Sequence, residues 1–579
     1  MNYIKNLEKN LTKDQKDILK HIYEPTVVAT PLADSRRDIC ILPDGEIRSY
    51  GRLYSKKHGD KTGQVAYLSS KDCGLSWSIN YSHSKMNSCT YMEKGDVYIN
   101  VCEKSNNYNG IEEGLYVMRS KIGPDDENPE IIKVSDKPYA DSFLPKQSQY
   151  TNRIWFTAQI KHSPAFFYSD DFGLTWTIRE IPNPNNFEIV FPHKGLRWCK
   201  KSGTEPNVIE ISKNNMMMII RTPMDCFYKS YSKDGGDSWS APEPTNFYGT
   251  NTTAYLLKLS DGRIINFWNN TKPLSQPNLK NTLGSTESVI EGYGENAFTN
   301  RDAAHAAISL DGGKTFKGYR EIILNPIRNN SDFRYIGGVN DTLDKSVHQF
   351  QAFELPFNKV LVSAGQNAAS RRILIFDVDW LCETNRKEDF LSGMKNVTSH
   401  TYLKSVSGSH YAEVGNGHCS WNRIQSAYPF PDTEDTFGEV ILVSKYADDR
   451  KINDISGICW NFPLSKKGRV SVKIKILEKQ ARFILSDRWY NVCDMYAAYQ
   501  SPFFFELDKL DTGDGYADID IDYDVNNKMA QVKINGEFAF KVKMNVESSV
   551  GLCYLLLQCA CDGDSKGFCI KSIEKCDLN

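Results

Sequence analysis

One short pattern occurs four times in this chain and constrains its fold more than any other feature. Each copy reads Ser-x-Asp-x-Gly-x-Ser/Thr-aromatic and follows an apolar, strand-like run; the copies span residues 70–77, 169–176, 232–239 and 309–316. The Asp and Ser/Thr side chains can hydrogen-bond the backbone of a tight turn, Gly supplies an unusual φ, and the aromatic ring buries between neighbouring strands. The pattern predicts repeated β-hairpin units that carry the same turn.

A second repeat runs through residues 26–388. An apolar strand, a tight polar turn and a second apolar strand recur, with turns at Asp44-Gly45, Gly95-Asp96, Asn152, Asn214-Asn215, Asp261-Gly262 and Asn358-Lys359. Six such hairpins, each needing two further strands, predict a six-bladed β-propeller. Residues 1–25 are predicted to form a helical extension, with one short amphipathic helix over residues 1–22 packed on the propeller.

The pattern changes after the charged stretch 383–388. Residues 469–476, 517–524 and 530–542 alternate apolar and polar side chains, as half-buried antiparallel strands do. We therefore predict an all-β chain in which the propeller is followed, over residues 389–579, by a jelly-roll or lectin-like β-sandwich. Two roles for this second domain stay open: a wall for the active site, and an independent sugar-binding module.

Composition excludes several function classes. The chain has 70 basic and 72 acidic residues, so its charge indicates neither a nucleic-acid nor a membrane partner. Its 15 cysteines are odd in number and lack CxxC pairs, which is typical of reduced thiols rather than a disulfide framework or zinc site. We expect a cytoplasmic protein, since no signal peptide or membrane span is recognisable, and no metal or other cofactor, since no P-loop, GxGxxG or HExxH motif occurs.

The fourfold pattern resembles the Asp box (BNR repeat) of the sialidase-like β-propellers, and the resemblance continues into the C-terminal region. In that family the Asp box lies between the third and fourth strands of a blade, away from the ligand mouth. The resemblance therefore implies a structural role for Asp72, Asp171, Asp234 and Asp311. It also implies an exo-acting glycoside hydrolase that removes a terminal sugar from an oligosaccharide, with sialic acid or another acidic ulosonic sugar as the default.

The sharpest candidate for chemistry is the segment 203–222. Glu205 begins one strand and Arg221 ends its hairpin partner, so the two side chains are expected to meet at the mouth of the propeller. The resemblance implies that Glu205 is a base or the activator of a nucleophile, and that Arg221 grips a substrate carboxylate, as Arg does in bidentate pairs. A plain ion pair without a catalytic part is the alternative.

Other blades supply further candidates for the mouth. Asp60 or Asp302 is expected to be the acid that protonates the glycosidic oxygen. Sialidases carry a nucleophilic Tyr at the start of the sixth blade, where this chain has His348 and Gln349, so His348 is a further catalytic candidate; Tyr335 lies upstream. The remaining candidates for substrate binding are Arg37 (with Arg36 as its alternative), Arg301, His305 and Asn270.

The missing Tyr leaves other functions open. An inverting glycosidase for a non-sialic sugar needs only an acid and a base carboxylate with room for a water between them. A propeller that binds carbohydrate without catalysis is the rival from another class. The expected partner is an oligosaccharide, and a homo-oligomer is left open.

Overall fold

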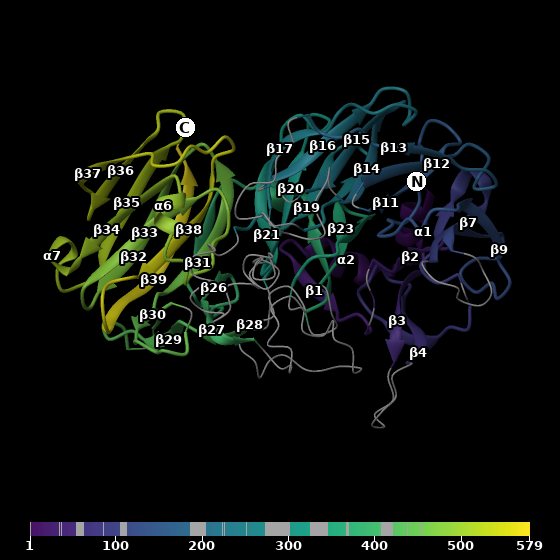
Figure 1. Cartoon of the computed structure of the whole chain (residues 1–579). Helices are drawn as coiled ribbons and strands as arrows, with labels where there is room; N and C mark the ends of the chain where they lie inside the picture. The colour runs from purple at the N-terminus through teal and green to yellow at the C-terminus, as the bar shows by residue number, and fades with distance from the viewer. Residues whose placement is uncertain are drawn as a thin grey trace.

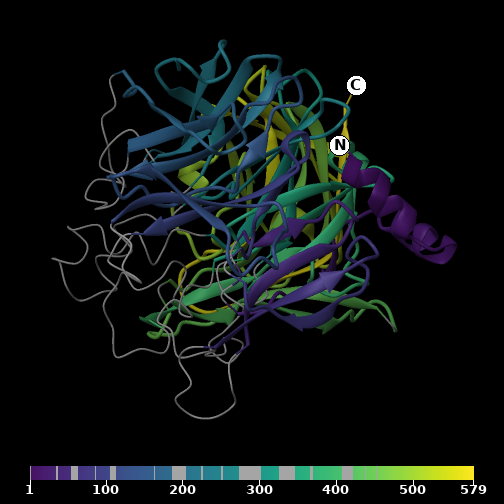
Figure 2. The same cartoon turned by 90° about the vertical axis from the view of Figure 1, so that its right-hand side faces the viewer.

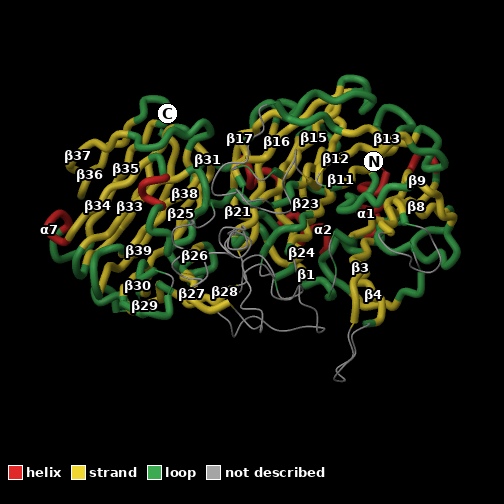
Figure 3. Tube along the Cα trace, in the orientation of Figure 1, coloured by secondary structure: helices red, strands yellow, loops and turns green. Residues whose placement is uncertain are grey.

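A computed structural model describes residues 2–33, 35, 37–53, 63–84, 86–104, 113–161, 163–185, 204–222, 224, 226–249, 252–272, 301–324, 346–365, 370–406, 421–436, 438–451 and 453–578. Two bodies built mainly of strands lie side by side (Figures 1 and 3). The N-terminal body runs from purple to green in Figure 1, and the C-terminal body from green to yellow.

The described part of the N-terminal body contains six four-stranded antiparallel sheets, which confirms the predicted propeller. Every predicted turn joins the first two strands of a sheet. The blades are, in order, β2 (Ile39–Ile41), β3 (Ile47–Leu53), β4 (Gln64–Ser70) and β5 (Ser78–Tyr81); β6 (Thr90–Met92), β7 (Val97–Lys104), β8 (Gly114–Ser120) and β9 (Glu130–Ser135); β10 (Lys146–Gln147), β11 (Ile154–Ile160), β12 (Ser163–Ser169) and β13 (Thr177–Glu180); β14 (Thr204–Ser212), β15 (Asn215–Arg221), β16 (Cys226–Ser232) and β17 (Glu243–Tyr248); β18 (Tyr255–Lys258), β19 (Ile264–Trp268), β20 (Ala303–Ser309) and β21 (Lys317–Leu324); and β22 (Gln351–Leu355), β23 (Lys359–Ala364), β24 (Arg372–Asp377) and β1 (Thr26–Ala29).

The sixth blade closes the ring with strands from both ends of the propeller. Its fourth strand is β1, which pairs antiparallel with β24 so that Thr26 lies opposite Ile375. Because the first strand of the chain completes the last blade, the ring cannot open without breaking this ladder.

The N-terminal extension packs next to that closure. The predicted single helix is two helices, α1 (Asn2–Asn10) and α2 (Lys13–His21). They separate at Thr12, whose side chain accepts a hydrogen bond from the Gln15 backbone N–H while Gln15 caps Thr12 in return. Such a capping box starts a new helix. Leu7 and Leu19 are fully buried in a cluster with residues of blades one and six, and Figure 2 shows both helices on one flank of the ring.

The four Asp boxes have one geometry. In the first, Ser70 Oγ donates to Asp72 Oδ1 (2.8 Å), Ser76 Oγ donates to Asp72 Oδ2 (2.5 Å) and Trp77 Nε1 donates to the Gly74 carbonyl (2.9 Å). The Ser and Ser/Thr bonds to the Asp recur at Asp171, Asp234 and Asp311. Each box links the third and fourth strands of blades one, three, four and five, so these Asp residues have the structural role expected of them.

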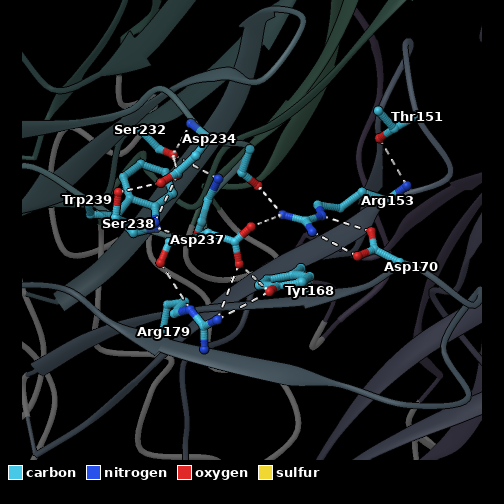
Figure 4. A network of polar contacts seen from close by, with 12 residues as sticks. Thr151, Arg153, Tyr168, Asp170, Arg179, Ser232, Asp234, Asp237, Ser238 and Trp239 are labelled. Carbon is cyan, nitrogen blue, oxygen red and sulfur yellow. Dashed lines mark hydrogen bonds and ion pairs between the residues drawn. The ribbon is translucent and has the colours of Figure 1, made fainter.

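A charged network ties the boxes of blades three and four together (Figure 4). Arg153 makes a bidentate pair with Asp170, with both N···O distances 2.8 Å, and reaches Asp237 at 3.3 Å. Its guanidinium lies 3.8 Å from the centre of the Tyr168 ring. One Arg therefore links polar turns of adjacent blades on the face of the ring that carries the boxes.

The Asp boxes should contribute to stability and not to chemistry. We expect Asp234→Asn to lower the free energy of unfolding by about 1–2 kcal/mol, because it weakens charge-assisted hydrogen bonds. Burial opposes ionisation, but the Ser238 hydroxyl and backbone N–H outweigh it and lower the pKa of Asp234 to about 2. This contribution is therefore present above about pH 4 and is lost as the pH falls through the folded pKa.

Urea unfolding of Asp234→Asn at pH 7 and pH 3 measures this contribution. Asp311→Asn, at the same position of blade five, should behave alike. If both variants had the free energy of unfolding of the wild-type protein at pH 7, the stabilising role of the Asp boxes would be contradicted.

The C-terminal body is an antiparallel β-sandwich. In the described residues, one sheet holds β25 (Arg386–Glu388), β29 (Ala427–Pro431), β30 (Glu439–Lys445), β32 (Lys467–Ile476), β35 (Ala517–Asp524), β36 (Met529–Ile534), β37 (Glu537–Lys543) and β39 (Ser565–Asp577). The other holds β26 (Val397–Thr398), β31 (Ser456–Ser465), β33 (Gln480–Ser486), β34 (Phe503–Asp508) and β38 (Leu552–Cys559). A separate hairpin is formed by β27 (His400–Val406) and β28 (Trp421–Gln425), and the sandwich also carries the short helices α6 (Ala497–Gln500) and α7 (Lys509–Thr512). The propeller region has two short 3-10 helices, η1 (Glu93–Gly95) and η3 (Val378–Cys382).

The central strand of the five-stranded sheet, β38, is buried on both faces. All eight residues of β38 are buried; Leu555 and Leu557 face the core of the sandwich, while Tyr554 and Leu556 join a cluster with Trp268 and other residues of blades four and five. Such continuous apolar runs are typical of strands with no solvated face. The sandwich thus shares one apolar core with the flank of the propeller. In the part of the chain that the structure describes, no helix has the length and apolar character needed to cross a membrane.

Candidate active site

The mouth of the propeller lies opposite the Asp boxes. Within a blade the first and third strands run in the same direction, since both pair antiparallel with the second. The start of each first strand therefore lies at the end of the ring away from the box that follows the third strand. Near these starts, five non-glycine residues have left-handed backbone: Arg37 (φ 57°), Ser88 (φ 62°), Asp141 (φ 54°), Glu205 (φ 45°) and Gln349 (φ 63°). Such strain costs about 1–3 kcal/mol per residue and clusters at functional sites.

A β-bulge aims Glu205. Thr204 lies opposite Arg221, and Asn207 lies opposite Ile219, so β14 carries one extra residue between these pairs. In a regular strand Glu205 would point to the face opposite Arg221. The bulge and the left-handed backbone turn its carboxylate back, and Arg221 Nη1 donates to Glu205 Oε2. Both side chains are 5% exposed.

Arg37 completes this cluster from blade one. Its Nη2 lies 3.4 Å from Glu205 Oε1, and its guanidinium lies 4.4 Å from the centre of the Phe143 ring in blade three. Its Nη1 is buried and has no hydrogen-bond partner among the described residues. In this cluster the Glu205 carboxylate therefore lies between two guanidinium groups, and Arg37 keeps a donor for a ligand.

Asp141 stands beside the cluster, and the sequence analysis did not identify it. It precedes the first strand of blade three, and Gln159 Nε2 donates to its Oδ2 (2.5 Å). Burial and the charge of Glu205 raise the pKa of Asp141, although Gln159 and Arg37 oppose the shift. The rule that selected Arg37, a polar residue just before a first strand, applies equally to Asp141.

Lys146, on the first strand of blade three, links this blade to blades four and five. Its Nζ donates to Asn207 Oδ1 (3.2 Å), the Val208 carbonyl (3.0 Å) and the Leu256 carbonyl (3.2 Å). Burial lowers the pKa of Lys146 to about 7. Tyr255, whose ring centre lies 4.9 Å from this ammonium, has its pKa raised to about 12, chiefly by burial. The phenol is therefore not an activated nucleophile.

Arg301 and His348 form a second contact between blades five and six. Arg301 Nη1 lies 3.1 Å from His348 Nε2, and both residues are buried. Asp302 follows Arg301 directly, and its Oδ2 lies 3.5 Å from Nε2 of His400 on β27 of the sandwich. Neighbouring residues of an extended segment point to opposite sides, so Arg301 contacts the next blade while Asp302 contacts the second domain.

Asn270 and His305 lie in the interface between the two domains. The Asn270 backbone N–H donates to His305 Nδ1 (3.0 Å), which leaves His305 Nε2–H to donate to the Tyr554 hydroxyl (2.5 Å). Tyr554 donates in turn to Glu321 Oε1 (2.6 Å). Burial lowers the pKa of His305 to about 3, so the imidazole is neutral at physiological pH. The Asn270 side chain donates to the Asp487 carbonyl (2.9 Å).

The structure thus divides the candidates predicted from the sequence. It brings Arg37, Glu205 and Arg221 together at the mouth, pairs Arg301 with His348, and turns Asp302, His305 and Asn270 toward the sandwich. Asp60, Arg36 and Tyr335 lie outside the described residues. Within those residues, no group of three or more His, Cys, Asp or Glu side chains is arranged to hold a metal ion.

Comparison with known proteins gives one family match. Residues 143–335 match the model of the BNR repeat-like domain, which agrees with the Asp boxes and the four-stranded blades: the fold is sialidase-like. An alignment 209 positions long with the anhydrosialidase of Macrobdella decora has 26% identity and covers 32% of this chain. The match spans about a quarter (24%) of that relative's length.

Three of the solved structures that match this chain have TM-scores below 0.4. A protein of unknown function from Dyadobacter fermentans is 18% identical over 61% of this chain and 98% of its own, with a TM-score of 0.39. A mutant of Trypanosoma rangeli sialidase with trans-sialidase activity is 11% identical over 97% of this chain and 95% of its own (TM-score 0.36). NanB sialidase from Streptococcus pneumoniae is 11% identical over 64% and 73% (TM-score 0.36).

Proposed function

We propose that this protein is an exo-acting glycoside hydrolase that removes a terminal acidic sugar from an oligosaccharide. The observation that carries the proposal is the convergence of Arg37 and Arg221 on Glu205 at the mouth, with Arg37 Nη1 unpaired among the described residues. A sugar carboxylate fits that donor, because guanidinium groups bind carboxylates in charge-assisted pairs. The name of the curated relative, anhydrosialidase, supports a sialic acid or a related sugar.

An inverting reaction fits the described residues better than one through a tyrosine nucleophile. In the ranges the structure describes, the hydrogen bonds of the Glu205 carboxylate come from two arginines, and no tyrosine hydroxyl bonds to it. With a second carboxyl nearby at Asp141, Glu205 has the surroundings of a base that activates water. His348 and Gln349 stand where the sialidase resemblance places the tyrosine.

Binding of an acidic sugar tests the proposal directly. We expect N-acetylneuraminic acid to bind the wild-type protein, and Arg37→Lys to weaken binding about 10- to 100-fold, because Lys cannot reproduce the planar fork or its stacking on Phe143. Isothermal titration calorimetry measures both, with glucose as the neutral control and Arg179→Lys, from the network in Figure 4, as the control variant.

Equal affinity for the acidic and the neutral sugar would contradict the proposed binding of a sugar carboxylate by Arg37. A panel of 4-methylumbelliferyl glycosides (sialoside, uronide and neutral) then separates catalysis from binding. Binding without release of the fluorophore from any substrate would favour the non-catalytic carbohydrate-binding propeller, the rival that the missing tyrosine keeps open.

A further inference from the structure

Asp141 belongs to a segment that forms the blade-three side of the mouth. Backbone hydrogen bonds hold this segment along β11: Ala140 exchanges N–H···O bonds with Gln159 (2.8 and 2.9 Å), and Phe143 N donates to the Thr157 carbonyl (3.0 Å). Phe143 carries the ring against which the Arg37 guanidinium packs. Asp141 and Phe143, two positions apart in this segment, therefore both lie next to the cluster of Arg37 and Glu205.

The Asp141 carboxyl is held in a defined position while remaining accessible. Its backbone is left-handed, Gln159 fixes one oxygen at 2.5 Å, and the Glu103 carboxylate holds the next residue, Ser142, through its N–H (2.6 Å) and its hydroxyl (2.5 Å). The residue is exposed to solvent at the mouth, although enough protein surrounds its carboxyl group to disfavour the charged form. Among the described residues nothing hydrogen-bonds the second oxygen, Oδ1, which is therefore open to a ligand.

The two carboxyl groups of the mouth have opposite surroundings. Glu205 is ion-paired to Arg37 and Arg221. Desolvation by the surrounding protein and the negative charge of Glu205 raise the pKa of Asp141, and Glu103 adds a weaker effect in the same direction. The hydrogen bond from Gln159 and the positive charge of Arg37 lower this pKa but do not cancel the rise. Environments that separate the proton affinities of two neighbouring carboxyls assign one as acid and the other as base.

We propose that Asp141 is the catalytic acid of this site, acting with Glu205 as the base; the inference rests on the proposed function. Asp141 Oδ1–H gives its proton to the glycosidic oxygen as the bond from that oxygen to the anomeric carbon breaks, and the bonding pair stays with the oxygen. Glu205 takes a proton from the water whose oxygen bonds to the anomeric carbon. The aglycone leaves as an alcohol, and a proton returns from Glu205 to Asp141 through solvent.

A leaving-group series tests this assignment. With Asp141→Asn, we expect kcat/KM for a sugar-linked substrate to fall about 100- to 10,000-fold. For a 4-nitrophenyl glycoside, whose leaving group needs little protonation, we expect a loss of no more than about tenfold. The alkaline limb of the pH profile, which reports the acid, should disappear in Asp141→Asn and return in Asp141→Glu. Circular dichroism and urea unfolding check that the variants are folded.

Asp60→Asn and Asp302→Asn are the matched comparisons, because both carboxyls are rival acids. Asp302 is buried against His400, so its substitution should lower stability and affect all leaving groups alike. An equal loss over the whole series in Asp141→Asn, or a leaving-group dependence in Asp60→Asn or Asp302→Asn instead, would overturn the assignment. Absence of turnover by the wild-type protein on every glycoside would instead overturn the proposed function itself.

Discussion

Replacing Glu205 by Gln is expected to lower kcat by at least about 1,000-fold while the affinity for an acidic sugar stays the same or rises. Gln keeps the shape of the side chain but cannot accept a proton from water. The substitution also removes the internal negative charge between Arg37 and Arg221. The two guanidinium groups then attract a ligand carboxylate without competition.

The same change should destabilise the free protein. An ion pair that is 5% exposed on both sides leaves an uncompensated charge when one partner is removed, at a cost of about 3–5 kcal/mol. A bound acidic sugar should restore part of this loss, because it replaces the missing carboxylate. Single-turnover kinetics, calorimetry and urea unfolding with and without N-acetylneuraminic acid measure the three effects.

Glu210→Gln is the matched control for this prediction. Glu210 lies on the same strand, is also buried, and accepts hydrogen bonds from Ser148 Oγ at 2.8 and 3.0 Å. Its substitution should cost stability without changing turnover, because it lies toward the opposite end of β14. Full turnover by Glu205→Gln, or loss of turnover in both variants, would remove Glu205 from the mechanism.

Tyr554→Phe is expected to lower the free energy of unfolding by about 3 kcal/mol. The hydroxyl accepts from His305 at 2.5 Å and donates to Glu321 at 2.6 Å, with all three residues buried. Removing it leaves an imidazole N–H and a carboxylate oxygen without this partner inside the interface, and buried unpaired groups are costly. The contact between propeller and sandwich should weaken accordingly.

Tyr523→Phe separates this effect from the loss of any buried hydroxyl. Tyr523 is equally buried, but among the described residues its hydroxyl hydrogen-bonds a neutral group, Ser465 Oγ (2.6 Å), within the sandwich. That variant should lose about 1 kcal/mol. Urea unfolding measures the free energy of unfolding of both variants. Equal losses would show that the hydrogen bonds from His305 through Tyr554 to Glu321 stabilise the protein no more than a single hydrogen bond of a buried tyrosine.

Most of the architecture could be predicted because its signals are local. The Asp box completes its hydrogen bonds within eight residues, so Asp72 and Gly74 specify the same turn wherever the segment lies. The hairpin turns are equally local. The prediction of one helix over residues 1–22 is wrong at Thr12, where Thr12 and Gln15 form a capping box that starts the second helix.

The site depended on contacts between distant segments. Glu205 could be placed at the mouth, but only the bulge between Thr204 and Asn207 turns it toward Arg221. Asn270 and His305 have the side chains of a sugar site in the sequence. In the structure they contact the sandwich: β38 brings Tyr554, 249 positions beyond His305, to His305, and Asp487 accepts a hydrogen bond from Asn270.

By itself, the sequence determined the repeating unit, the number of blades and the all-β character of both halves, since turn chemistry and side-chain alternation act over a few residues. Only the tertiary structure decided which polar residues share a site. Closure of the ring brings Arg37, Asp141 and Glu205 from three blades to one mouth, while docking of the second domain buries Asp302 and His305 elsewhere. Contacts between such distant residues depend on strand register, β-bulges and the packing of the two domains, which cannot be predicted from a short segment of sequence.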